Sequence, residues 1–161
     1  MPNFVTNVVT LQGIGSDNRF YTIDEDDDTK RFDFNKIIPE PTTADECVAK
    51  YGTGYLDSVD EGGHSLKRLD HSDGRPWFDW YNWHCDFWGT KWNAFGTGII
   101  DDNTIQFQTA WGAPDPIFGA LSRMFPDMEL RVHSEYEGDG SVDSVYLNGK
   151  VVSSVMSEEQ M

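Results

Sequence analysis

The stretch WFDWYNWHCDFWGTKW, residues 77–92, decides how the rest of the sequence is interpreted. Eight of its sixteen residues are Trp, Phe or Tyr, and five of the six tryptophans of the chain lie inside it. Such a density of rings is typical either of a surface built for stacking or of a hydrophobic core. The spacing of the rings along the stretch distinguishes these two interpretations.

Pro76 stands where a helix commonly begins, and the pattern predicts a helix from that residue through the stretch. With Trp77 at zero and a step of about 100° per residue, Trp88 falls near ~20° and Tyr81 near ~40°. Polar residues fill the opposite side, so we expect an amphipathic helix that docks its aromatic side on a sheet. Trp83 falls near ~240°, outside the aromatic arc, and is expected to stay exposed.

The remaining patterns predict such a sheet. Residues 4–12, FVTNVVTLQ, are rich in β-branched residues and predict a strand. Thr43 and Glu46 fit a capping box for a short helix that ends at Gly52, and Asn148-Gly149 predicts a hairpin between two short apolar runs. Further strands are expected after Gly89, over 104–111 and over 128–136, with a second helix that is capped by Asp115, opens at Pro116 and stops at Pro126.

The order of these elements predicts an α+β fold, with a ferredoxin-like βαββαβ core on an antiparallel sheet, an inserted helix and loop excursion, and a C-terminal hairpin. A chain of 161 residues is the length of one domain. We therefore expect a single domain over 1–161, with an insertion-rich region at 13–75 and a flexible tail at 157–161. No apolar run is long enough to span a bilayer and no signal peptide is evident, so a cytoplasmic location is expected.

The charge is the most unusual feature of the composition. Twenty-eight acidic residues against twelve basic ones give a net charge of −16. Such a charge repels a phosphate backbone, so direct binding to nucleic acid is disfavoured. It favours instead a partner with a basic surface, although an acidic surface also serves solubility alone.

Several segments resemble a known family. They are MPNFVTNVVTLQG at the start, FDFNKIIPEP at 32–41, WGTKWNA at 88–94, FQTAW at 107–111 and LSRMFPDMEL at 121–130, which is followed by EYEGDG. Together they resemble the YubB-like ferredoxin-fold family of conjugative plasmids and bacteriophages. The resemblance implies a ferredoxin-like fold and an origin in a mobile element, in a bacterial host cell. It implies no reaction and no catalytic residues.

No motif predicts an enzyme, and no catalytic residues are assigned. His84, Cys85 and Asp86 are adjacent, and neighbouring helical residues diverge, so the three cannot close on one ion. His64 and His71 match no zinc spacing either. We expect neither a metal site nor a cofactor.

The first functional hypothesis is an anti-defence inhibitor of a phage or plasmid. Carboxylates on a rigid fold can imitate the phosphates of a nucleic acid and occupy the basic groove of a host defence complex. The candidate contact residues are Asp24, Glu25, Asp26, Asp27 and Asp28 in one acidic loop, with Asp57, Asp60 and Glu61 in the excursion.

The alternative hypothesis is a module that binds a nucleotide or single-stranded nucleic acid. Stacking of a base on an aromatic ring contributes about 1–3 kcal/mol, so exposed tryptophans could hold one. The stacking candidates are Trp83, Trp92 and Trp111, with Lys91 and Arg123 as phosphate contacts.

Overall fold

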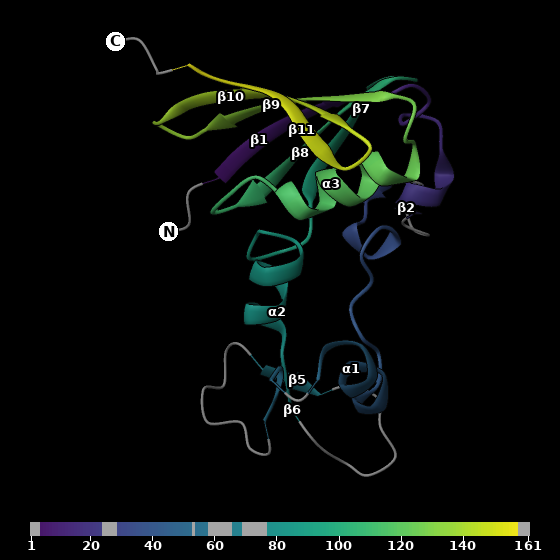
Figure 1. Ribbon diagram of the computed structural model, residues 1–161, viewed down its shortest axis with the longest axis vertical. Helices are drawn as coiled ribbons and strands as arrows, with labels where there is room; N and C mark the ends of the chain where they lie inside the picture. The colour runs from purple at the N-terminus through teal and green to yellow at the C-terminus, as the bar shows by residue number, and fades with distance from the viewer. Residues whose placement is uncertain (1–3, 24–28, 53, 58–65, 69–76, 158–161) are drawn as a thin grey trace.

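A six-stranded antiparallel sheet forms the upper layer of the computed structural model in Figure 1. The structure describes residues 4–23, 29–52, 54–57, 66–68 and 77–157. The strand order is β11-β10-β9-β1-β8-β7. The strands are β1 (Phe4–Thr10), β7 (Phe95–Asp101), β8 (Thr104–Ala110), β9 (Glu129–Tyr136), β10 (Gly140–Leu147) and β11 (Lys150–Ser157).

The predicted first strand is a central one. β1 pairs with β8 on one side and with β9 on the other, so its backbone is satisfied along both edges. Val5, Asn7 and Val9 are fully buried, and the alternate positions are partly exposed. This period-two pattern is why FVTNVVT forms a strand with one face on the core.

The C-terminal hairpin is confirmed and is longer than the sequence pattern indicated. Asn148 and Gly149 both adopt positive φ, 50° and 82°, which is the backbone of the tight turn that Asn-Gly favours. β10 and β11 extend from this turn over eight residues each. Residues 158–161 of the expected flexible tail lie outside the described residues, whereas Ser157 is the last residue of β11.

One helix packs directly against this sheet. α3 (Asp115–Met124) contacts β9, β10 and β11 from below in Figure 1 and buries Ile117, Phe118 and Leu121. Asp115 was expected to cap this helix but is its first residue, and Pro114 holds the cap position without a side-chain hydrogen bond. The helices in Figure 1 all lie on this side, so within the described chain the opposite face of the sheet is uncovered.

The tryptophan-rich stretch does not form one continuous helix. Trp77–Asp79 is a strand, β6, which pairs with β4 (Leu56–Asp57) and β5 (Leu66–Arg68), and α2 covers only Trp80–Phe87. The Asp79 carboxylate accepts a hydrogen bond from Asn82 N at 3.1 Å and caps the helix there. The prediction of a helix from Pro76 was therefore wrong, because Asp79 is the effective N-cap.

The expectation that Trp83 stays exposed was also wrong. Trp83 is fully buried, as are Phe78 and Trp88. Its indole packs against Tyr51 of α1 (Ala44–Tyr51) at 5.6 Å, and against Trp88 at 5.4 Å, between ring centroids. α2 therefore buries side chains both against α1 and against Trp88. A single apolar arc, which assumes one buried side, does not predict which of its residues are buried.

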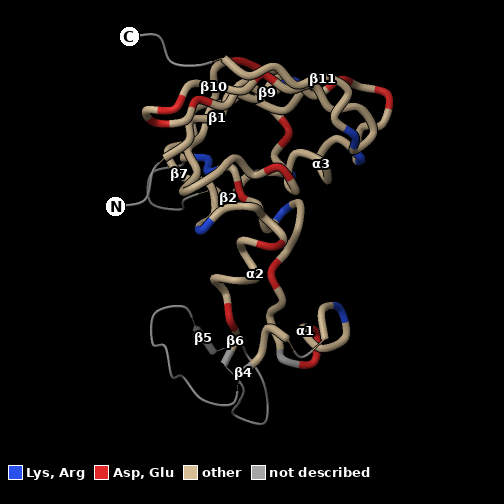
Figure 2. Tube along the Cα trace, turned by 60° about the vertical axis from the view of Figure 1, so that its left-hand side comes forward, with Lys and Arg blue, Asp and Glu red and all other residues tan. Residues whose placement is uncertain are grey.

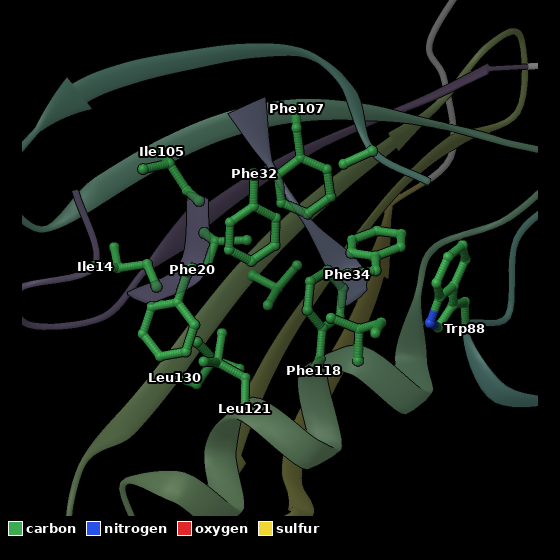
Figure 3. Close-up of a cluster of buried hydrophobic side chains, with 14 of the residues drawn as sticks. Ile14, Phe20, Phe32, Phe34, Trp88, Ile105, Phe107, Phe118, Leu121 and Leu130 are labelled. Carbon is green, nitrogen blue, oxygen red and sulfur yellow. The ribbon is translucent and has the colours of Figure 1, made fainter. Parts of the chain in front are cut away.

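The inserted region supplies part of the core. β2 (Tyr21–Ile23) pairs with β3 (Lys30–Phe32), and this hairpin leads to Phe34. Phe32 stacks on Phe107 of β8 with ring centroids 4.9 Å apart, and Phe34 packs edge-on against Trp88 at 5.6 Å. Figure 3 shows these rings above α3. The buried residues form one cluster from Val9 to Tyr146 that includes Trp83 and Cys47.

Two local predictions were near the observed structure. Thr43 is the N-cap of α1 and accepts a hydrogen bond from Glu46 N at 3.1 Å, as expected, while the Glu46 carboxylate reaches Thr42 N instead of Thr43 N. The strand expected directly after Gly89 begins at Phe95. The chain bends before it, where the Thr90 hydroxyl donates a hydrogen bond to Trp92 O at 2.6 Å.

Candidate functional site

The acidic loops favoured by the sequence are mostly not part of the described structure. Asp57 is the last residue of β4. The other seven predicted contact residues lie outside the described residues: Asp24, Glu25, Asp26, Asp27, Asp28, Asp60 and Glu61. Their role as a contact surface stays a prediction.

A different group of carboxylates lies on the described part of the chain. Glu135, Glu137, Asp139 and Asp143 are all exposed, and they surround the turn that joins β9 to β10. We call these four residues the β9–β10 acidic surface. Figure 2 shows acidic positions in red around this end of the sheet, near the β10 label.

Strand alternation places part of this surface on the uncovered face of the sheet. Leu130, Val132 and Ser134 of β9 point into the core and are buried, so Glu135 points the other way. Asp143 lies opposite His133 in the β9–β10 register, and Ser141 lies opposite Glu135. The two carboxylates therefore share one face with the imidazole between them.

His133 is the titratable base within this surface. Its Nδ1 lies 2.6 Å from Asp143 Oδ1, and its Nε2 lies 3.4 Å from Glu135 Oε1. The hydrogen bond with Asp143 raises the pKa of the imidazole above its ordinary value; desolvation opposes this rise and Glu135 supports it. Protonated His133 would offset one negative charge, so the surface is most negative above the raised pKa.

The acidic surface borders a shallow groove. Glu135 and Glu137 line it together with Phe4, Thr6 and Ser141, and its volume is about 430 Å³. Glu137 Oε2 also accepts a hydrogen bond from Phe4 N at 3.4 Å, which ties the turn to the start of β1. Two carboxylates at a groove lined mostly by polar side chains suit the charged head of a Lys or Arg side chain.

The sequence carries a signal for this surface. In ELRVHSEY, Glu129, Arg131, His133 and Glu135 alternate with apolar or small residues, which is the pattern of a strand with one charged face. The adjoining EGDG adds two carboxylates at a glycine turn, where Gly138 has φ 79°. Arg131 is paired with Glu129 at 2.6 Å and so does not neutralise the other acids.

The second candidate site is partly assembled by the fold. The Lys91 ammonium lies 4.9 Å from the Trp92 ring centroid and 4.7 Å from that of Trp111, within the range of cation–π attraction. The two tryptophans are 39 % and 47 % exposed. We call these three residues the Trp–Lys–Trp surface. Two of the three predicted stacking tryptophans therefore meet there, and the buried Trp83 does not.

Backbone contacts hold this surface in place. His84 Nδ1 donates to Lys91 O at 2.7 Å, because a carbonyl oxygen only accepts, and Lys91 N donates to Ala110 O at 3.3 Å. Trp111 has φ 77°, a left-handed conformation that is strained for a bulky residue. Tyr81 packs edge-on against Trp111 at 5.5 Å.

Arg123 does not join the Trp–Lys–Trp surface. Its side chain packs over Gly149 in the β10–β11 turn, so closely that a Cβ at Gly149 would clash with it. Arg123 lies in the last turn of α3, whereas Trp111 precedes the first. The helix rises by about 12 Å between Asp115 and Arg123. Arg123 thus lies away from Lys91, and its role as a phosphate contact stays a prediction.

The described residues offer no metal centre: within them, no group of three or more His, Cys, Asp or Glu side chains is arranged to hold an ion. His84 stacks on Trp88 with centroids 4.1 Å apart, and its Nε2 lies 3.1 Å from Glu40 Oε2. His64 and His71 lie outside the described residues. No described helix is both long and apolar enough to cross a membrane.

An antiparallel sheet with α3 packed on one face defines an α+β protein. Residues 75–161, which are 87 of the 161 in the chain, match the family model described as "Ferredoxin-like domain in Api92-like protein". The chain belongs to this family of ferredoxin-like domains, and this match supports the ferredoxin-like fold expected from the sequence. No curated protein and no solved structure matches the chain.

Proposed function

We propose that this protein is an acidic accessory protein of a phage or plasmid, related to the YubB-like proteins, that binds and inhibits a host nucleic-acid-handling defence complex. It acts by binding and not by catalysis, in the bacterial cytoplasm. Its carboxylates take the place of nucleic-acid phosphates on a basic surface of the partner. We further propose that β1, α2, β7, β8, α3 and β9 are the ferredoxin-like βαββαβ core, to which β10 and β11 are added.

The observation that supports this proposal is the local excess of negative charge where β9 joins β10. The β9–β10 acidic surface brings four exposed carboxylates together on a net charge of −16. The base that contacts these carboxylates is His133. Arg131, on the same strand, is paired with Glu129. The β9–β10 acidic surface therefore presents exposed negative charge to a basic partner.

The physical consequence is a strong dependence on salt. Nucleic-acid-binding grooves hold their ligand through Lys and Arg, and each contact releases condensed ions when the ligand is a polyanion. Carboxylates that fill the same groove attract the same cations over about 8–10 Å at physiological ionic strength. Capture of such a partner should weaken as salt rises, and duplex DNA should compete with it.

The experiment is affinity capture from a bacterial host lysate, at low and high salt, with and without duplex DNA as competitor. One variant carries Glu135→Gln, Glu137→Gln and Asp139→Asn, and leaves Asp143 to hold His133. The matched control carries Asp45→Asn, Asp102→Asn and Asp127→Asn, which are exposed positions elsewhere. Each variant removes three negative charges and so changes the net charge from −16 to −13.

The proposal predicts a captured protein that salt and DNA both release, and that the β9–β10 variant loses while the control retains it. Equal capture by both variants would exclude the β9–β10 acidic surface as the contact. Loss in both variants to the same extent would indicate that only total charge matters. A captured protein that DNA does not displace would contradict mimicry.

The Trp–Lys–Trp surface favours a second function, the binding of a nucleotide or single-stranded nucleic acid. A base could stack on the open face of Trp92 or Trp111 while Lys91 contacts its phosphate. This proposal rests on the distances of Lys91 to both indoles and on the strained backbone of Trp111.

Tryptophan fluorescence tests this second function. Titration with oligothymidylate should quench the emission of the wild-type protein, and Trp111→Ala together with Lys91→Gln should remove most of the quenching. Trp80 and Trp88 remain as reporters of an intact core in the variant. An absence of quenching in the wild-type protein at micromolar ligand would exclude this function.

A further inference from the structure

The strand β11 is an edge of the main sheet with an unusual surface. It lies at the end of the strand order, beyond β10, and all eight of its residues are exposed. Four of them are large and apolar: Val151 is 53 % exposed, Val152 58 %, Val155 57 % and Met156 80 %. Within the strand, only Lys150 carries a charge.

Such an edge is normally protected. An edge strand presents unpaired backbone N–H and C=O groups, and proteins usually shield it with charges, proline or a covering element. β11 has one bulge, where Val145 of β10 lies opposite Ser153 and Tyr146 lies opposite Val151, so Val152 has no partner in β10. The outer edge of β11 carries Val152, Val155 and Met156, and no strand pairs with it within the described residues.

We propose that a second copy of this chain covers this edge, and that the two β11 strands pair antiparallel around a two-fold axis at Ser154. Both copies then contribute to one continuous sheet. A two-fold axis perpendicular to a sheet keeps the same face upward in both copies, so directly opposed residues point to the same side.

This register covers the most exposed apolar side chains. With Ser154 on the axis, Ser153 lies opposite Val155 of the second copy, and Val152 lies opposite Met156 of the second copy. Each contact occurs twice by symmetry. Val155 and Ser153 both face the side of Asp143 and Val145, as their pairing with β10 shows. The register is thus consistent with the direction of these side chains.

The charge distribution makes this edge the place where two copies would meet with least repulsion. Two chains of charge −16 repel each other over most of their surface, but β11 itself has no acidic residue. The other sheet edge, β7, is less suitable because its register is irregular at two places and it contains Gly96 and Gly98. Pairing of β11 with the β7 of another copy would also be heterologous, and would give a ring or an open chain of molecules and not a two-fold dimer.

Sedimentation equilibrium of the purified chain tests the proposal, at concentrations from ~1 to ~200 µM, since dimerisation follows mass action. We expect the wild-type protein to form a dimer. Val152→Glu or Met156→Lys alone should weaken the dimer by at least ~10-fold, because each places an unpaired charge against an apolar side chain. Ile100→Lys on the β7 edge, where Ile100 is 57 % exposed, is the matched control and should have no effect.

A charge-swap experiment tests the register. An equimolar mixture of the Val152→Glu and Met156→Lys proteins should recover dimers, because the carboxylate introduced at position 152 would then face the ammonium introduced at position 156 of the other chain. Circular dichroism checks that each variant is folded. A wild-type chain that stays monomeric at the highest concentration overturns the proposal. Single variants that dimerise like the wild-type protein, or a mixture that shows no recovery, overturn it as well. None of these results depends on the proposed inhibitor function, because the purified chain alone is measured.

Discussion

The indole of Trp83 packs edge-on against the ring of Tyr51, with centroids 5.6 Å apart and planes at 81°. This contact joins α2 to α1 across 32 residues of sequence (83 − 51). It shows that the centre of the tryptophan-rich stretch belongs to the core. The contact surface of the protein must therefore be sought elsewhere.

Removal of Trp83 should be costly. Trp83→Ala deletes a fully buried indole and should lower the free energy of unfolding by about 3–5 kcal/mol. Trp83→Phe should cost much less, because the buried Trp83 Nε1 makes no hydrogen bond within the described residues. Denaturant titration measures both, with Trp92→Ala, at a 39 % exposed site, as the control. Equal costs for Trp83→Ala and Trp92→Ala would show that Trp83 is not in the core.

The inserted hairpin should be necessary for stability and not only an appendage. Phe32 and Phe107 are both fully buried, and their rings stack at 4.9 Å. Phe32→Leu and Phe107→Leu, singly and together in a double-mutant cycle, should reveal a coupling of about 0.5–1.5 kcal/mol. Additive effects would mean that the stack contributes nothing beyond burial.

The β10–β11 turn offers a matched pair of glycines. Gly149 and Gly138 have nearly the same φ, 82° and 79°, but a Cβ at Gly149 would meet Arg123, whereas one at Gly138 would meet nothing within 4 Å. Gly138→Ala should cost about 1 kcal/mol from backbone strain alone. Gly149→Ala should cost more, and an added Arg123→Ala should remove the difference. An excess that persists without Arg123 would assign the cost to the turn itself.

His133 should make stability depend on pH in a defined direction. Its folded pKa is raised above the ordinary 6.5, chiefly by Asp143. A raised pKa means that the stabilisation is fully present below the unfolded pKa and is lost as pH rises through the folded one. The melting temperature of the wild-type protein, relative to that of Asp143→Asn, should therefore fall as pH rises through this window.

Proton NMR titration of His133 provides the direct check. Asp143→Asn should lower the pKa of His133 toward its ordinary value, and Asp127→Asn, which changes the same charge at a distant exposed site, should leave it nearly unchanged. If Asp143→Asn does not move the pKa, the 2.6 Å contact is not present in solution.

Local patterns predicted much of the main sheet and the helix α3, and little of how the tryptophan-rich stretch folds. β1, β8, β9 and α3 follow from alternation and helical spacing within their own residues. The start of α2 does not follow from local patterns, because a helix could begin at Pro76 or be capped by Asp79. The pairing of β6 with β4 and β5 selects Asp79. The partner strand β4 lies about twenty positions earlier in the chain, where no local pattern reaches.

The candidate sites show the same division. Trp92 and Trp111 meet at Lys91 only because the turn after α2 lies beside the end of β8. In the β9–β10 acidic surface, Glu135, Glu137 and Asp139 are neighbours in sequence, and only Asp143 needs the strand register, which brings it opposite His133. Charge in a loop such as DEDDD is visible in the sequence, whereas charge gathered across two strands is visible only once their register is known.

Binding of a basic partner by the carboxylates of the β9–β10 acidic surface is the central claim. The most direct measurement is the dissociation constant for the captured partner as a function of salt, for the wild-type protein and for the Glu135→Gln, Glu137→Gln, Asp139→Asn variant. We expect a steep loss of affinity with salt in the wild-type complex, and a clearly shallower slope in the variant. An affinity that does not change with salt, or the same slope for both proteins, would contradict the claim.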